Sequence, residues 1–209
     1  MRTKTLLLTA ALVAVGAASS MAQVYSQNAV GYINLNLPQG FSMIANQLKT
    51  ANNTLAEVLP APPAGTLIYK LVGANFVIGT FDEFDLNWGA NANLAMGPGT
   101  GFFIALPTAA TITLVGEVPQ GILSTPTPTG FSLIGSQVPQ AGPVTTLGLV
   151  AGLGDTLYKF ANNNYTIFNF DEFDAMWLPS IPNLGVGEGF YLNRVPGSPT
   201  TWTRTFSVN

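Results

Sequence analysis

The chain has 209 residues, of which 47% are hydrophobic and only 8% are charged, and its formal net charge is -3. This apolar content, together with 22 Gly and 15 Pro, is typical of a folded, turn-rich protein and excludes a disordered one. The few basic side chains exclude the positive surface with which proteins bind nucleic acid. Because Cys and His are absent, the sequence also excludes disulfides, His-dependent catalytic triads and zinc sites built from imidazole or thiolate.

Residues 1–22 have the composition of a secretory signal peptide. Arg2 and Lys4 precede an apolar run at residues 5–18, and small side chains follow where signal peptidase cuts. The run is shorter than the ~20 apolar residues that cross a bilayer, and no comparable run follows. We therefore expect a secreted protein, extracellular or at the cell surface with the periplasm as the alternative, and no membrane span in the mature chain.

The elements that follow are predicted to be strands. Ile33, Leu35 and Leu37 alternate with Asn, a pattern typical of a strand with one buried face. The segment TLAE from Thr54 resembles a capping box and predicts one short helix. Hairpin turns are expected at VGAN in the first half of the chain and at ANNN in the second, because Gly and Asn tolerate positive φ. Further strands are expected at residues 41–45, 66–71, 76–81, 101–106 and 111–115.

The second half of the chain repeats these signals in the same order. GYINLNLPQGFSMIA from Gly31 aligns without a gap with GILSTPTPTGFSLIG from Gly121. LIYK and FDEFDLNW recur as TLYK and FDEFDAMW, and the Gly-x-Gly-Phe motif at Gly99 recurs at Gly187. Three ordered matches indicate a duplication. We therefore predict a first β repeat at residues 23–116 and a second at residues 117–209.

The density of short strands predicts the fold class. About six strands are expected in each repeat of ~90 residues, which is compatible with a small sandwich or barrel. No linker separates the repeats. The sequence therefore predicts an all-β protein made of two tandem homologous β-sandwich or barrel-like lobes packed together.

The acidic turn FDEFD, present in both repeats, is the densest charge in the chain. The favoured interpretation is structural: Phe81, Phe84 and Trp88 enter the core while the carboxylates face solvent or cap the following turn. Calcium binding is the first alternative, although the spacing is not that of an EF-hand loop. Glycoside hydrolysis is the second, but adjacent solvated carboxylates lack the raised pKa that its acid needs. The candidate calcium ligands are Asp82, Glu83, Asp85, Asp171, Glu172 and Asp174.

The glycine-rich segments GPGTG and GVGEG superficially resemble phosphate-binding loops. Neither carries the P-loop lysine or leads into a predicted helix. We expect Gly97, Gly99 and Gly101 to provide unusual backbone angles or a close approach between strands.

Aromatic side chains are the other candidates for a site, because flat apolar faces with polar rims suit sugar rings. The strand TWTRTFSV places Trp202, Arg204 and Phe206 on one face. Trp202 has no counterpart in the first repeat, so we expect it to be exposed and to be a ligand residue. The other candidates, for which core packing is favoured, are Trp88, Trp177, Tyr69 and Tyr158.

The combined pattern of Gly-Phe-Ser-Leu/Met-Ile, Leu/Ile-Tyr-Lys, FDEFD…W and Gly-x-Gly-Phe-Phe/Tyr resembles a duplicated module of secreted bacterial proteins whose function is uncharacterised. Members of that family begin, after the signal, with a segment similar to VYSQNAVGYINLNLP, found here from Val24. More loosely, the pattern is similar to the GWNLIS…PGxGYW β-modules of large cell-surface proteins, with Phe41 and Phe131 where those modules have Trp. The resemblance implies export and a β fold and brings no catalytic residues.

The expected function is that of a secreted structural, adhesive or self-assembling protein of the cell surface or extracellular matrix, not of an enzyme. Its expected partners are further copies of itself or other surface proteins. The alternative is a carbohydrate-binding module whose exposed aromatic side chains bind glycans. No cofactor is expected, calcium at the acidic turns being the alternative.

Overall fold

The protein is described here by a computed structural model of residues 29–208, and the predicted signal peptide lies outside this range. Its regular structure is almost entirely β, so the all-β class is confirmed. The strands of the first repeat are β1 (Val30–Leu37), β2 (Gly40–Ala45), β3 (Leu67–Val72), β4 (Asn75–Thr80), β5 (Gly101–Leu106) and β6 (Ala110–Glu117).

The second repeat contributes nine strands to the described part of the chain. They are β7 (Gly121–Pro126), β8 (Gly130–Gly135), β9 (Gly142–Pro143), β10 (Thr156–Ala161), β11 (Asn164–Phe170), β12 (Trp177–Leu178), β13 (Asn183–Leu184), β14 (Gly189–Arg194) and β15 (Thr201–Phe206). The helical elements are α2 (Leu55–Val58) and one 3-10 turn, Gly89–Asn91. Within residues 29–208, no helix combines the length and the apolar composition that crossing a bilayer requires.

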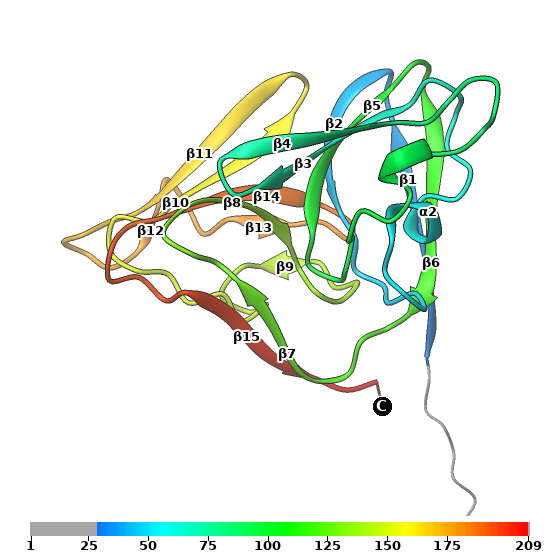
Figure 1. The fold of residues 1–209 in the computed structure, drawn as a ribbon. Coiled ribbons are helices and arrows are strands. Elements are labelled where there is room, and N and C mark those ends of the chain that lie inside the picture. Colours follow the sequence, from blue (N-terminus) through cyan, green and yellow to red (C-terminus); the bar gives the residue numbers. More distant parts are fainter. Residues whose placement is uncertain (1–28, 209) are drawn as a thin grey trace, which may run out of the picture.

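The strands pair in the same way in both repeats (Figure 1). The first repeat forms an antiparallel sheet of order β2-β5-β3-β4, and the second forms one of order β8-β14-β10-β11, extended by β12. Strand β1 pairs with β6, and β7 pairs with β15, as separate two-stranded ribbons. The predicted hairpin turns lie between β3 and β4 and between β10 and β11, with positive φ at Gly73, Asn162 and Asn163.

Strand periodicity places alternate side chains into two main cores. Ile33 in β1, Ile68 in β3 and Phe102 in β5 are buried in one cluster. Leu157 in β10 and Phe190 in β14 are buried in a second cluster. Because successive side chains of a strand point to opposite faces, the neighbours of these core residues point away from the cores.

The glycines shared by the two repeats lie where the two sheets meet. The backbone N–H of Ala45 donates to the carbonyl of Gly187 (2.9 Å), and its counterpart Gly135 donates to Gly99 (3.0 Å). Both acceptor glycines have positive φ, 73° at Gly187 and 87° at Gly99. These reciprocal bonds join the end of β2 to the loop before β14, and the end of β8 to the loop before β5.

The second glycine of each motif is required by close packing. A Cβ at Gly101 would lie 2.6 Å from the backbone nitrogen of Ile134, and one at Gly189 would lie 2.5 Å from the carbonyl oxygen of Ile44. Distances this short exclude any side chain unless the backbone moves. The expectation of a close approach between strands is confirmed for Gly101 and that of an unusual backbone angle for Gly99, but Gly97 shows neither feature.

The short helix at Leu55–Val58 is also confirmed, but its predicted capping box is wrong. Thr54 makes no side-chain capping hydrogen bond. Glu57 instead accepts hydrogen bonds from Thr50 Oγ1 (2.7 Å) and from the backbone and side chain of Asn52 (2.8 and 2.6 Å). These hydrogen bonds lower the pKa of Glu57 to about 2, and the bond from Thr50 makes the largest contribution. Its carboxylate therefore organises the preceding loop.

Candidate functional site

Aromatic side chains cover the faces of the two sheets that point away from the cores. In β3 the buried Ile68 is followed by Tyr69, and in β10 the buried Leu157 is followed by Tyr158. Tyr69 pairs across the sheet with Phe103, as Tyr158 does with Tyr191. The pattern is duplicated, since the corresponding positions of the two repeats are Phe41 and Phe131, Tyr69 and Tyr158, Phe76 and Tyr165, and Phe103 and Tyr191.

These rings form one continuous network that runs from the first repeat into the second. Phe103 lies 5.2 Å from Phe160 and 5.9 Å from Tyr191, measured between ring centroids. Tyr165 lies 5.1 Å from Phe160, and Phe131 lies 6.0 Å from Tyr191. Such spacings are those of favourable edge-to-face and offset aromatic pairs. The network therefore holds both hairpins against a shared aromatic layer.

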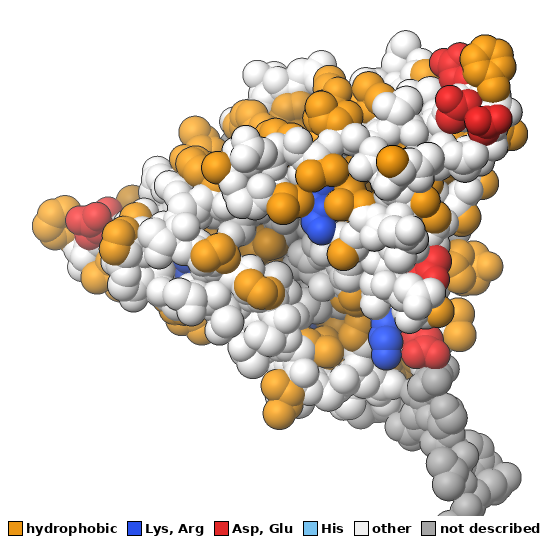
Figure 2. Space-filling view, viewed as in Figure 1, with side chains coloured by type: hydrophobic (Ala, Val, Ile, Leu, Met, Phe, Trp, Pro, Cys, Tyr) orange, Lys and Arg blue, Asp and Glu red, His pale blue; other side chains and the backbone are white. Residues whose placement is uncertain are grey.

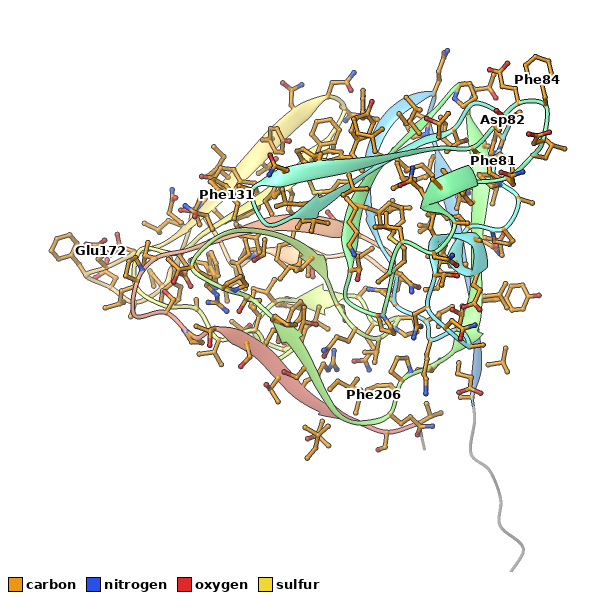
Figure 3. The ribbon with its side chains drawn as sticks, in the orientation of Figure 1. Phe81, Asp82, Phe84, Phe131, Glu172 and Phe206 are labelled. Atoms are coloured by element: carbon orange, nitrogen blue, oxygen red, sulfur yellow. The ribbon has the colours of Figure 1, made fainter. Side chains whose placement is uncertain are left out.

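A cavity with a volume of about 800 Å³ lies along this layer. One side is formed by Leu71, Gly73 and Ala74 of the β3–β4 hairpin, whose tip lies beside Phe131 (Figure 3). We call this cavity the aromatic groove. Its volume lies within the range of small-molecule binding sites. Its aromatic wall comes from the second repeat and consists of Phe131, Tyr158, Tyr165 and Tyr191.

The rings of the groove are open to solvent to an unusual degree for aromatic side chains. Phe131 is 54% exposed and Tyr165 is 48% exposed. A smaller hollow of about 340 Å³ continues the surface over Phe41 and Phe76 and shares Tyr165 and Tyr191 with the groove. A ligand could therefore contact several ring faces in a row.

The groove also offers hydroxyl groups. Burial raises the pKa of Tyr191 to about 12, with a further contribution from Tyr165, and burial also raises the pKa of Tyr165. Both phenols therefore remain protonated at neutral pH and can donate hydrogen bonds. Within residues 29–208, the hydroxyls of Tyr158, Tyr165 and Tyr191 make no hydrogen bond to the protein, so they are available to a ligand.

The acidic turns have a structural arrangement that is the same in both repeats. Asp82 Oδ1 accepts hydrogen bonds from the backbone N–H groups of Phe84 and Asp85, both at 2.7 Å. Asp171 Oδ1 accepts the corresponding two bonds, both at 2.8 Å. These backbone hydrogen bonds lower the pKa of Asp82 and of Asp171. The larger contribution comes from the N–H of Asp85 for Asp82, and from the N–H of Asp174 for Asp171. The expected capping role of the carboxylates is observed for these two aspartates.

The two acidic turns do not form a common site. Figure 3 places Asp82 and Phe84 at one corner of the molecule and Glu172 at the opposite corner. Figure 2 likewise shows acidic side chains gathered at two distant corners. Among residues 29–208, no group of three or more metal-ligating side chains converges. The six proposed calcium ligands, Asp82, Glu83, Asp85, Asp171, Glu172 and Asp174, thus lie on two separate turns.

Two expectations about aromatic side chains are wrong. Trp202 is only 1% exposed: it packs against Phe190 at 6.0 Å between centroids, and its indole N–H donates to the carbonyl of Leu147 (3.0 Å). Its faces are covered, so it offers no platform to a sugar. Phe84, expected in the core, is instead 92% exposed, because the Asp82-centred turn directs it outward. Its counterpart Phe173 is 94% exposed.

The other aromatic candidates divide into two groups. Trp88 and Trp177 are buried, and each packs against the first Phe of its acidic motif at 5.2 and 5.3 Å between centroids. Tyr69 and Tyr158, the tyrosines considered for a sugar platform, belong to the aromatic network. The groove residues Phe131, Tyr165 and Tyr191 were missed. Their signal was available, because both repeats carry aromatic residues at these positions next to core residues.

An asymmetric feature of the second repeat was also missed. Arg194 and Asp155 form a buried ion pair at 2.5 Å, with side chains 1% and 0% exposed. Asp155 also accepts hydrogen bonds from the backbone of Gly152 (2.7 Å) and from Ser198 Oγ (2.6 Å). The pair connects three segments of the second repeat and lines none of the cavities described above.

Comparison of the chain with protein-family models, curated proteins and solved structures found no match.

Proposed function

We propose that the protein is a secreted, non-enzymatic adhesive protein of the cell surface or extracellular matrix that binds glycans in its aromatic groove. The observation that carries the proposal is the row of four rings in the groove: Phe131 and Tyr165 are about half exposed, and the three phenolic hydroxyls have no hydrogen-bond partner among the described residues. Sugar rings present C–H faces that pack on aromatic rings and hydroxyls that pair with polar rims. A purely apolar ligand would leave the phenols Tyr158, Tyr165 and Tyr191 without partners, which makes it the poorer fit.

The arrangement of the acidic residues supports a role without catalysis. A hydrolase acting on glycosides needs one carboxylic acid with a raised pKa opposite an ionised carboxylate. The pKa values of Asp82 and Asp171 are instead lowered by backbone hydrogen bonds. Neither residue lines the aromatic groove.

Replacement of Tyr165 tests the proposal. Tyr165→Ala is expected to weaken glycan binding about thirtyfold, because a central aromatic contact is commonly worth about 2 kcal/mol. Tyr165→Phe keeps the ring and loses one hydroxyl, so a loss of about fivefold is expected. A glycan array would identify the ligand, and titration calorimetry would measure the three affinities.

Tyr32→Ala provides the matched control, because Tyr32 is an exposed ring on β1 that lies outside the groove. Its affinity should equal that of the unchanged protein. An array without any glycan response would refute the proposal, as would a response that Tyr165→Ala leaves intact.

Self-assembly is a second candidate function, favoured by the exposure of Phe84 and Phe173. Each ring projects from a turn held by an aspartate, and the two turns lie at opposite corners (Figure 3). Each turn carries a second exposed apolar side chain, Leu86 or Met176, and clustered exposed apolar side chains mark contact points between proteins. Two such points on one chain would permit a continuing assembly of identical copies.

Light scattering over a wide concentration range would test this second candidate. The unchanged protein is expected to show a mass that rises with concentration, and the double variant Phe84→Ser/Phe173→Ser is expected to remain a monomer. Tyr32→Ser, which removes an exposed ring elsewhere, should behave as the unchanged protein. A strict monomer at all concentrations would exclude self-assembly through these turns.

A further inference from the structure

A second cavity, of about 370 Å³, adjoins the aromatic groove and differs from it in chemistry. The two cavities share Leu71, Gly73, Pro128 and Phe131, so a ligand lying in the groove can extend into this neighbour. We call it the lysine pocket. Its polar lining includes Lys70, Thr100, Thr125 and Ser132.

The lysine of this pocket has no acidic partner. The Nζ of Lys70 donates to the carbonyl of Ala95, and no carboxylate among the described residues lies within ion-pairing distance of it. An ammonium group has three N–H donors, so two remain for a ligand. Burial lowers the pKa of Lys70, which is consistent with a cation that no carboxylate compensates.

The second repeat contains the corresponding lysine together with an acidic partner. Lys159, the counterpart of Lys70, also donates to a backbone carbonyl, that of Asn183. It additionally forms an ion pair with Glu188 at 2.9 Å. Thr100 occupies the position in the first repeat that Glu188 occupies in the second. The lysine pocket therefore lacks the carboxylate that its duplicate supplies from within the chain.

Two buried hydroxyls in the same pocket also lack partners. Thr125 is 7% exposed and Ser132 is 8% exposed, and neither Thr125 Oγ1 nor Ser132 Oγ has a hydrogen-bond partner from the protein. A buried polar atom without a partner is energetically unfavourable. Both residues line the lysine pocket, but their hydroxyl oxygens are enclosed, so Lys70 is the donor that a ligand can reach.

The cavity that corresponds to the lysine pocket in the other half has about the same volume, 360 Å³, and is lined by Glu188 and Phe160. In that cavity the anionic group is the carboxylate of Glu188, which belongs to the protein itself. The two cavities differ in charge at one position, Thr100 against Glu188, and in further uncharged positions such as Thr125 against Leu35.

We propose that the lysine pocket receives the carboxylate of an acidic sugar, such as a hexuronate, in a glycan whose neighbouring rings lie in the aromatic groove. This inference rests on the glycan-binding function proposed above. A carboxylate takes the place that Glu188 holds beside Lys159, and it accepts hydrogen bonds from the ammonium group of Lys70. Hydrogen bonds from a charged donor to a charged acceptor are the stronger kind.

The test compares trigalacturonate with its methyl ester, using titration calorimetry on the purified protein. The acid is expected to bind about tenfold more tightly than the ester, and the difference should shrink at high salt. Lys70→Met is expected to remove this preference, so that the acid and the ester bind with equal affinity.

Thr100→Glu is the matched variant, because it installs the carboxylate that the second repeat already has. It should also remove the preference for the acid, and thermal unfolding should show that both variants remain folded. A Lys70→Met variant that keeps the preference would overturn the inference.

The outcomes separate this inference from the function on which it rests. If the ester binds as tightly as the acid, the carboxylate site is wrong and glycan binding stands. If the glycan array gives no response at all, both proposals fail. A sulfated sugar that binds as tightly as the uronate, with the same loss in Lys70→Met, would overturn the assignment to a carboxylate.

Discussion

Gly101→Ala is expected to destabilise the protein by about 3 kcal/mol or more. The new Cβ would lie 2.6 Å from the backbone nitrogen of Ile134 and 2.8 Å from the carbonyl carbon of Leu133. Both are backbone atoms of β8, so no side-chain rotation can relieve the contact. The reciprocal bond from Gly135 to Gly99 lies beside this contact and would be disturbed with it.

Urea unfolding would measure the loss, and the same loop provides a control. A Cβ added at Gly97 would meet no atom within 4 Å, and the φ of Gly97 is not positive, so Gly97→Ala should change stability by less than about 1 kcal/mol. Equal unfolding midpoints for Gly101→Ala and Gly97→Ala would contradict the proposed role of the close approach. Gly189→Ala, at the corresponding position, should behave as Gly101→Ala does.

Arg194→Leu is expected to destabilise the protein by about 3 to 5 kcal/mol, because it leaves the carboxylate of Asp155 buried without its cation. The remaining partners of Asp155 include Ser198 Oγ and the backbone N–H of Val195 (3.1 Å). Hydrogen bonds alone do not replace a compensating charge in a fully buried position. The carboxylate would then take up a proton or draw in water.

The first repeat supplies the compensating double variant. Thr66 and Leu106 occupy the positions of Asp155 and Arg194 there, and both are buried. Asp155→Thr/Arg194→Leu is therefore expected to be more stable than either single variant, as measured in a double-mutant cycle by urea unfolding. A double variant whose loss equals the sum of the two single losses would show that the pair is not coupled.

The two repeats use the same scaffold and differ in a few charged positions. Asp155 with Arg194, and Glu188 with Lys159, are both ion pairs of the second repeat. The first repeat has Thr66, Leu106 and Thr100 at three of these positions and keeps only the lysine, Lys70. These two cations of the second repeat are thus paired with carboxylates of the same repeat, whereas Lys70 has no acidic partner among the described residues.

Local sequence patterns determined the strands and turns. Alternation of apolar residues predicted β1 and the strands of both sheets, and Gly and Asn marked the hairpin turns. These features depend on neighbours along the chain, because side chains of a strand alternate between two faces and positive φ favours Gly and Asn. The packing of Phe81 against the buried Trp88, and of the partly buried Phe170 against the buried Trp177, agrees with the structural interpretation of the acidic motif.

The tertiary structure decided which aromatic side chains are exposed and where a site can exist. The sequence pattern predicted a buried Phe84 and an exposed Trp202, but the turn directs Phe84 outward, and Leu147 and Phe190 cover Trp202. The aromatic groove requires the β3–β4 hairpin to lie beside the second sheet. The sequence by itself therefore determined an all-β chain with repeated strand motifs, and the contact between the two sheets decided the groove, since exposure depends on residues that are distant along the chain.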